Sequence, residues 1–164
     1  MKLNSTLRYE ADPAAVFAML IDEDFIAKKT YAANAIRHSA SVQRNGDSAT
    51  IRLTRVMPPD VPDLIRKFVG DTIDIQQTDV WGPADTDGSR DGTIELSVAG
   101  APVKAQGIMR LRPEGAATVI TIAGDIKASI PLFGGQVEKS VLEGLTVAAK
   151  REQATGDAWL AARR

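Results

Sequence analysis

The chain has 164 residues, with 20 Lys and Arg against 21 Asp and Glu, 44% hydrophobic residues, one His and no Cys. This length and composition predict a single domain over residues 1–164 that folds without disulfides or a structural metal. The missing Cys and the lone His exclude thiol chemistry and the usual Cys- or His-rich metal sites, so we expect no cofactor and no metal. The net charge of −1 gives no electrostatic basis for binding nucleic acid.

The sequence contains no segment typical of a membrane helix. The longest apolar run, 14–21, has eight residues, whereas a membrane-spanning helix needs about twenty. Residues 1–9 lack the apolar stretch of a secretory signal. We therefore expect a cytoplasmic protein without stable membrane insertion.

The first third of the chain predicts a strand followed by two short helices. Residues 2–9 alternate between apolar and polar side chains, as a half-buried strand does. Asp12 and Pro13 are typical of the start of a helix. Asp22 or Asp24 can cap a second helix, which should end near Asn34 because Asn tolerates the left-handed conformation.

From residue 35 to residue 130 the hydrophobic period is two, which predicts six further antiparallel strands. Asn45-Gly46 and Glu114-Gly115 are expected to form two-residue hairpin turns. These turns would pair Arg44 with Asp47, and Met109 with Ile120. Two more strands are predicted over 72–81 and 93–98.

In these registers one face of the sheet is mostly apolar and the other mostly polar, so one face should meet water. The predicted inner face includes His38, Ala40, Val42, Ile51, Leu53, Arg55, Ile73, Ile75, Gln77, Asp79, Trp81, Ile94, Leu96, Val98, Val103, Ala105, Gly107, Met109, Ile120, Ile122, Gly124 and Ile126.

After Pro131 the period returns to 3.6 and predicts a helix from about Gly135 to Ala162. One stripe of this helix carries Val137, Val141, Gly144, Ala148, Thr155 and Trp159, with Leu145 beside it. The middle of the stripe is small, and Gly costs a helix interior about 1 kcal/mol relative to Ala. Small residues on helix and sheet either bring the two layers close together or leave a hollow, and we expect a hollow because a curved sheet of long strands closes poorly.

The order of elements resembles the helix-grip fold of the START-like and birch-pollen-allergen-like superfamily, also called SRPBCC, which includes polyketide cyclases and lipid-transfer proteins. Four stretches resemble an uncharacterised actinobacterial family within it: VMPPDVPDLIRKFVG at 56–70, Trp81, GAPVKAQG at 100–107 and IPLFGGQVE at 130–138. The resemblance implies an α+β fold in which a seven-stranded curved antiparallel sheet wraps around a long C-terminal helix. It also implies a cavity between helix and sheet that holds an apolar ligand.

Three functions remain open at this point. The first is a carrier or sensor that binds a lipid, an isoprenoid or a polyketide-like molecule in the cavity. The second is a cyclase or hydrolase-like enzyme that uses the same cavity. The third is a co-chaperone-like interaction module, whose protein partners are unknown. Whether the protein is an enzyme is therefore undecided.

The ligand-binding residues that we predict all belong to the inner face of the sheet or to the stripe of the C-terminal helix. They are His38, Leu53, Arg55, Ile75, Gln77, Asp79, Leu96, Gly107, Ile122, Val141, Gly144, Leu145 and Ala148. No catalytic residue is assigned.

His38, Arg55, Gln77 and Asp79 are the polar members of this set, and they have three interpretations. They can lie at strand ends and in the core, they can orient a polar group of the ligand, or His38 can act as a general acid or base oriented by Asp79. The first interpretation is the simplest.

Two other segments have competing interpretations. Residues 64–69, after a proline-rich loop in which Asp63 can cap a helix, form either a lid over the cavity or a plug at one end of the core. Residues 87–92 resemble half of a calcium loop, but the twelfth position is Val98 where a bidentate acid is required, so we interpret them as a polar hairpin loop. Trp81 and Trp159 are interpreted as core residues.

Overall fold

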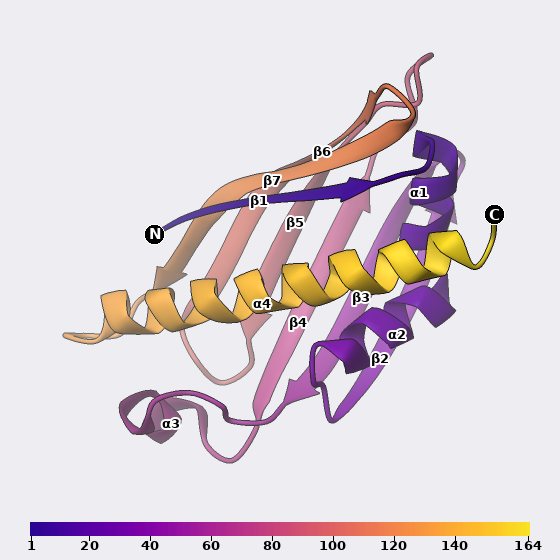
Figure 1. The fold of residues 1–164 in the computed structure, drawn as a ribbon. Coiled ribbons are helices and arrows are strands. Elements are labelled where there is room, and N and C mark those ends of the chain that lie inside the picture. The colour runs from indigo at the N-terminus through magenta and orange to yellow at the C-terminus, as the bar shows by residue number, and fades with distance from the viewer.

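The computed structural model describes residues 1–164, and its centre is an antiparallel sheet of seven strands in the order β1-β7-β6-β5-β4-β3-β2. The sheet curves, and the long helix α4 crosses its inner face (Figure 1). The strands are β1 (Lys2–Tyr9), β2 (Arg37–Asn45), β3 (Ser48–Met57), β4 (Ile73–Trp81), β5 (Arg90–Val98), β6 (Val103–Glu114) and β7 (Ala117–Ala128). The helices are α1 (Pro13–Leu20), α2 (Glu23–Ala32), α3 (Asp63–Val69) and α4 (Gly134–Ala161).

Helices α1 and α2 pack against the C-terminal part of α4, whereas α3 lies near its N-terminal part (Figure 1). This arrangement is the helix-grip architecture, so the predicted α+β fold class is confirmed. No helix of the structure is both long and apolar enough to cross a membrane.

The helix boundaries follow local side-chain chemistry. Asp12 caps α1 by accepting a hydrogen bond from the Ala15 backbone N–H, and Asp22 caps α2 in the same way. Asn34 ends the second helix with a φ of 75°, as predicted. The expected cap of α3 is wrong: Pro62 occupies the N-cap position, and no side chain caps this helix.

Both hairpins have the predicted faces but a register shifted by two residues. Asn45 pairs with Ser48, and Glu114 pairs with Ala117. In each turn the Gly is the first of the two central residues and has a φ of 61°, whereas the predicted pairing requires it to be the second. This position suits a type II′ turn, which requires positive φ only at its first central residue. Because side chains alternate with period two, a two-residue shift keeps every side chain on its predicted face.

Strand β5 begins three residues earlier than predicted, at Arg90. The reason is the buried Arg90 side chain, whose guanidinium donates to Oδ1 of the exposed Asp47 at 2.8 Å and to the Gly82 carbonyl at 2.9 Å. It also stacks on Phe17, with the guanidinium carbon 3.6 Å from the ring centroid. These contacts hold the start of the strand against the β3–β4 side of the sheet. The polar loop before it contains no group of metal-ligating side chains.

The inner face is filled with apolar side chains at two places. Beside α1, α2 and the end of α4, Phe17 meets Trp81 edge-on and Phe25 meets Trp159 edge-on. Both Trp side chains are buried, as their interpretation as core residues required. A second, smaller cluster gathers around Ile65 of α3, with Val103, Ala128 and Val137.

Candidate functional site

Between the two clusters, the inner face of the sheet borders a cavity of about 880 Å³. Its wall is formed by the end of α2, the segment from Met57 to Val69, strands β3 to β6 and the N-terminal two thirds of α4. Most of the lining side chains are hydrophobic, and exposed Tyr31 and Val147 lie on its rim. The volume falls within the range of about 300–1,000 Å³ that small-molecule sites occupy.

The structure brings about half of the predicted binding residues together on this wall. The predicted residues that line the cavity are Arg55, Ile75, Leu96, Val141, Gly144, Leu145 and Ala148. Leu53, Gly107 and Ile122 do not line it. Neither do His38, Gln77 and Asp79.

Gly144 borders open space beside α4. A Cβ atom built on this residue would meet no atom within 4 Å. At this position the helix therefore has room for a side chain toward the cavity. This geometry corresponds to the hollow that the small residues of the stripe predicted.

Gly107 and Gly124, in contrast, are small for a reason unrelated to the cavity. They face each other across β6 and β7. A Cβ on Gly107 would lie 2.7 Å from the Ala123 carbonyl oxygen, and one on Gly124 would lie 2.7 Å from the Gly107 Cα. The two glycines thus allow a close backbone approach within the sheet, which the sequence pattern could not distinguish from a cavity wall.

Three polar side chains form a chain of hydrogen bonds along the inner face. The Arg55 guanidinium donates to Gln77 Oε1 at 2.8 Å, and Gln77 Nε2 donates to the Asp79 carboxyl oxygens at 2.9 and 3.1 Å. Burial raises the pKa of Asp79 and lowers the pKa of Arg55, because each charged form loses solvation. Only Arg55 of the three lines the large cavity.

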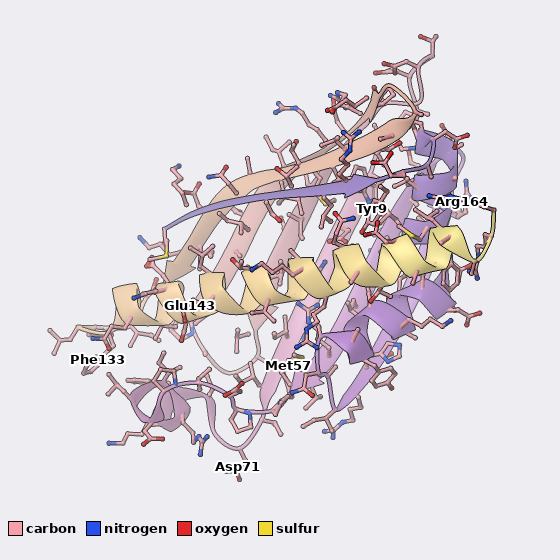
Figure 2. The ribbon with its side chains drawn as sticks, in the orientation of Figure 1. Tyr9, Met57, Asp71, Phe133, Glu143 and Arg164 are labelled. Atoms are coloured by element: carbon pink, nitrogen blue, oxygen red, sulfur yellow. The ribbon has the colours of Figure 1, made fainter.

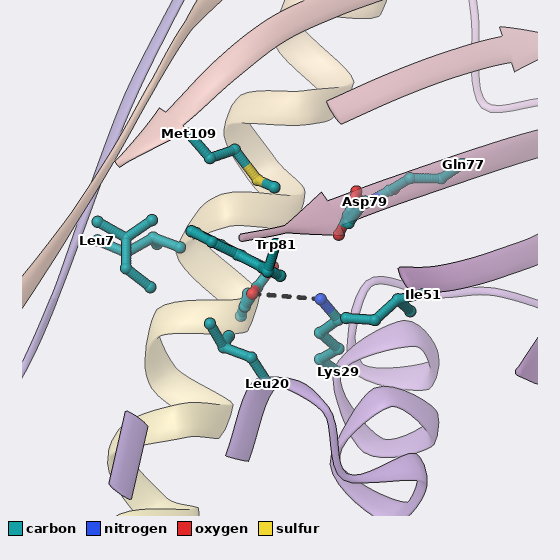
Figure 3. A pocket seen from close by; sticks show the side chains of 10 residues that line it. Leu7, Leu20, Lys29, Ile51, Gln77, Asp79, Trp81 and Met109 are labelled. Atoms are coloured by element: carbon teal, nitrogen blue, oxygen red, sulfur yellow. Dashed lines mark hydrogen bonds and ion pairs between the residues drawn. The ribbon is translucent and has the colours of Figure 1, made fainter. Parts of the chain in front are cut away.

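Gln77 and Asp79 also border a second, smaller cavity of about 40 Å³. Gln77 and Asp79 line it together with Lys29 of α2 and Glu152 of α4 (Figure 3). Lys29 Nζ lies 3.3 Å from Glu152 Oε1, and both side chains are largely buried. Sequence analysis missed this pair because its members lie on two helices far apart in the chain, and neither belongs to an apolar stripe.

His38 does not form the catalytic arrangement that was one interpretation of the polar residues. Its neighbour across the strand pair is Arg55, while Asp79 bonds to Gln77 instead. The His38 ring meets Tyr31 edge-on at 4.9 Å, and its Nδ1 atom is buried without a hydrogen-bond partner. Asp79 therefore cannot orient this ring in the structure.

Several lining residues were absent from the prediction because they come from segments without a regular hydrophobic period. They are Tyr31, Ala32, Ala33 and Asn34 at the end of α2, then Met57, Pro58, Asp60, Val61, Pro62, Ile65 and Val69 around α3. The proline-rich loop before α3 was the only sequence signal for these residues, because it suggested that residues 64–69 lie at the cavity as a lid or a plug. Figure 2 shows Met57 at the end of β3 below α4, with Glu143 on the helix above this region.

Comparison with known proteins places the chain in a family. A family model described as "Protein of unknown function (DUF2505)" matches residues 4–160. The chain belongs to this family. An uncharacterised protein of Mycobacterium tuberculosis is 26% identical over 121 residues, which cover 71% of this chain and 69% of that protein.

Solved structures similar to this DUF2505 chain share its fold. A START superfamily protein from Mycobacterium smegmatis gives a TM-score of 0.55 at 13% identity and covers 96% of this chain and 98% of its own. The ZhuI aromatase/cyclase from Streptomyces gives 0.56 at 12% identity, with 95% and 93% covered. A STAR-related lipid transfer protein from Xanthomonas axonopodis gives 0.55 at 15% identity, with 92% and 84% covered. The chain therefore has the START-like fold that the sequence resemblance implied.

Proposed function

We propose that the protein binds a small apolar molecule in the cavity between the sheet and α4, as a carrier or a sensor. The observation that carries the proposal is the cavity of about 880 Å³, in which 18 of the 29 lining residues are hydrophobic. Removing apolar surface from water stabilises a complex by about 25 cal/mol per Å². An apolar molecule that fills the cavity and covers its apolar wall gains that stabilisation. The START-like neighbours named for lipid transfer and for aromatase/cyclase activity are consistent with such a ligand.

The geometry favours a binding protein over the two other functions. An interaction module would be supported by a filled core, and here the inner face is hollow beside α4. An enzyme would be supported by several buried polar groups that converge on the cavity. The only charged side chain on the wall that is buried is Arg55; Asp60, Lys104, Glu143 and Arg151 are exposed.

Native mass spectrometry of the protein purified from its own host tests the proposal. We expect a bound small molecule that is lost when the protein is denatured. The apo protein should in addition take up an environment-sensitive hydrophobic dye with one-to-one stoichiometry. A protein that emerges without a bound molecule, and that leaves the fluorescence of the dye unchanged, would show that the cavity is not a binding site.

A further inference from the structure

Arg55 has an unusual place among the charged residues of the molecule. Its side chain lies on the wall of the large cavity and is only 9% exposed. Its sole hydrogen bond is the one to Gln77 Oε1, although a guanidinium has five N–H donors. It takes part in no ion pair. A buried charge without a counter-ion is costly, so such groups are normally paired.

Arg90, in the same sheet, is a buried arginine whose guanidinium is paired within the protein. It is 8% exposed, about as buried as Arg55. Its guanidinium pairs with the Asp47 carboxylate and donates to two backbone carbonyls, of Asp47 and Gly82. Arg55 has none of these partners: its remaining N–H donors have no hydrogen-bond acceptor in the protein, and the residue borders the cavity.

The acidic groups nearest to Arg55 do not replace a direct counter-ion. Asp79 is separated from it by the Gln77 amide, which donates to both Asp79 oxygens. Burial raises the pKa of Asp79 because its charged form loses solvation. Glu152 is paired with Lys29.

We propose that the ligand carries a carboxylate, and that this head group pairs with the Arg55 guanidinium while the apolar body lies against Ile75, Leu96, Val141 and Leu145. The inference rests on the proposed function, and it adds the chemical class of the ligand. A planar carboxylate matches the donor fork of an arginine in a two-bond arrangement. A single buried cation balances a single negative charge, which favours a carboxylic acid over a dianionic phosphate.

A matched pair of ligands and a matched pair of variants test this inference. The ligands are dodecanoate and dodecanol, which have the same chain length, measured below their aggregation concentrations by isothermal titration at pH 7. The variants are Arg55→Met and Lys104→Met. Each removes one positive charge, but the exposed Lys104 side chain alternates with the buried, inner-facing Val103 and Ala105 and so lies on the outer face of the sheet.

We expect the wild-type protein to bind dodecanoate about 10- to 100-fold more tightly than dodecanol, the range that a hydrogen-bonded charged group supplies. Arg55→Met should abolish this preference and retain dodecanol binding, whereas Lys104→Met should retain the preference. Equal affinities in the wild type, or an undiminished preference in Arg55→Met, would overturn the assignment of the head group. Binding of neither ligand would overturn the assignment of the head group, and, if the apo protein also takes up no hydrophobic dye, the proposed function as well.

A second measurement keeps the inference testable if Arg55→Met fails to fold. Dodecanoate labelled with ¹³C at the carboxyl carbon can be titrated while bound to the wild-type protein. Pairing with Arg55 should hold the pKa of the bound carboxyl below that of the free acid. A bound carboxyl with an unchanged or raised pKa lies away from the guanidinium, and that result would contradict the proposal.

Discussion

Gly144 and Gly156 lie on the same helix, α4, but their surroundings are opposite. A Cβ on Gly144 meets no atom within 4 Å, whereas one on Gly156 would lie 2.8 Å from the Tyr9 Cζ atom. Helix propensity alone would favour replacing either residue, by about 1 kcal/mol relative to Ala. The space around each residue therefore decides the sign of the effect.

Replacing Gly144 by Leu should stabilise the protein and reduce the volume of the cavity. We expect a gain of about 1 kcal/mol from helix propensity, which raises Tm by about 2–4 °C. Uptake of a hydrophobic dye should fall because the new side chain occupies the cavity. The control Gly156→Ala should instead lower the free energy of unfolding by about 1–3 kcal/mol through overpacking against Tyr9. A large fall in Tm for Gly144→Leu would contradict the cavity.

Asp79 should make stability depend on pH. It faces Lys29 of α2 and Glu152 of α4, and Gln77 and Arg55 on the sheet. Burial raises its pKa above the ordinary value of 3.8, against the opposite effects of Lys29 and Gln77. The folded state thus keeps a proton that the unfolded chain has released. The free energy of unfolding should fall as pH rises from about 3.8 through the folded pKa.

Urea denaturation between pH 4 and 8 measures this dependence. Asp79→Asn keeps an oxygen acceptor for Gln77 and removes the titration, so its free energy of unfolding should vary less with pH. The control is Asp47→Asn, because hydrogen bonds from the Ala84 backbone and Arg90 lower the pKa of that carboxyl. The stabilising effect of the Asp47 carboxylate is lost only on the acid side, as the pH falls below the ordinary pKa of an Asp side chain and through the lowered pKa of Asp47. The same slope in wild type and Asp79→Asn would refute the role of Asp79.

At the scale of elements, the packing of α3 supports its interpretation as a plug. Ile65 is buried against Val103, Ala128 and Val137, which lie on β6, β7 and α4. Phe68 is exposed, and its ring lies 6.0 Å from the ring of Phe133, measured between centroids. One side of this short helix therefore closes the end of the core, and Ile65 also lines the cavity.

Replacing Ile65 by Ala should lower the free energy of unfolding by about 2–5 kcal/mol, the range for a large buried side chain. Phe68→Ala, on the exposed side of the same helix, should have a clearly smaller effect. Chemical denaturation of both variants gives the comparison. If Ile65→Ala costs less than Phe68→Ala, α3 is not anchored in the core and the lid interpretation gains support.

At the scale of the whole molecule, the inner face is divided into a filled part and a hollow part. Helix α4 packs against β1 and β7 and, toward its end, against α1 and α2. The aromatic side chains fill the space there, and the cavity lies between α4 and the strands β3 to β6. A ligand bound in the cavity would therefore contact both the sheet and α4.

Ligand binding should raise the thermal stability of the entire fold. A molecule that binds only the folded state stabilises it by about 2.7 kcal/mol at a concentration 100-fold above Kd, which corresponds to a rise in Tm of about 5–10 °C for a chain of this size. Differential scanning fluorimetry with a series of alkyl carboxylates measures the shift. We expect the shift to grow with alkyl chain length and to be absent in Gly144→Leu. A shift in that variant equal to the wild type would locate the ligand elsewhere.

The sequence alone determined the order of elements and the faces of the sheet. Period-two alternation assigns a side chain to one face whatever the exact register, so the faces survived the two-residue error in both hairpins. Local chemistry at Asp12, Asp22 and Asn34 likewise marked helix ends, because a cap acts only on its own helix. Gly144 was recognisable as an unfavourable residue in the interior of a helix. Gly156 carries the same signal but packs tightly on Tyr9, so only the structure showed that Gly144 borders a gap.

Only the tertiary structure decided which inner-facing residues meet the cavity. Arg55, Gln77 and Asp79 share one face, yet Arg55 alone lines the large cavity. The difference depends on where α4 and α2 cross the strands. The alternation of side chains shows which face of the sheet a residue is on, but it does not show which residues of a strand lie beneath a helix. The Lys29–Glu152 pair could not be predicted for the same reason, because its two helices come together only through long-range packing.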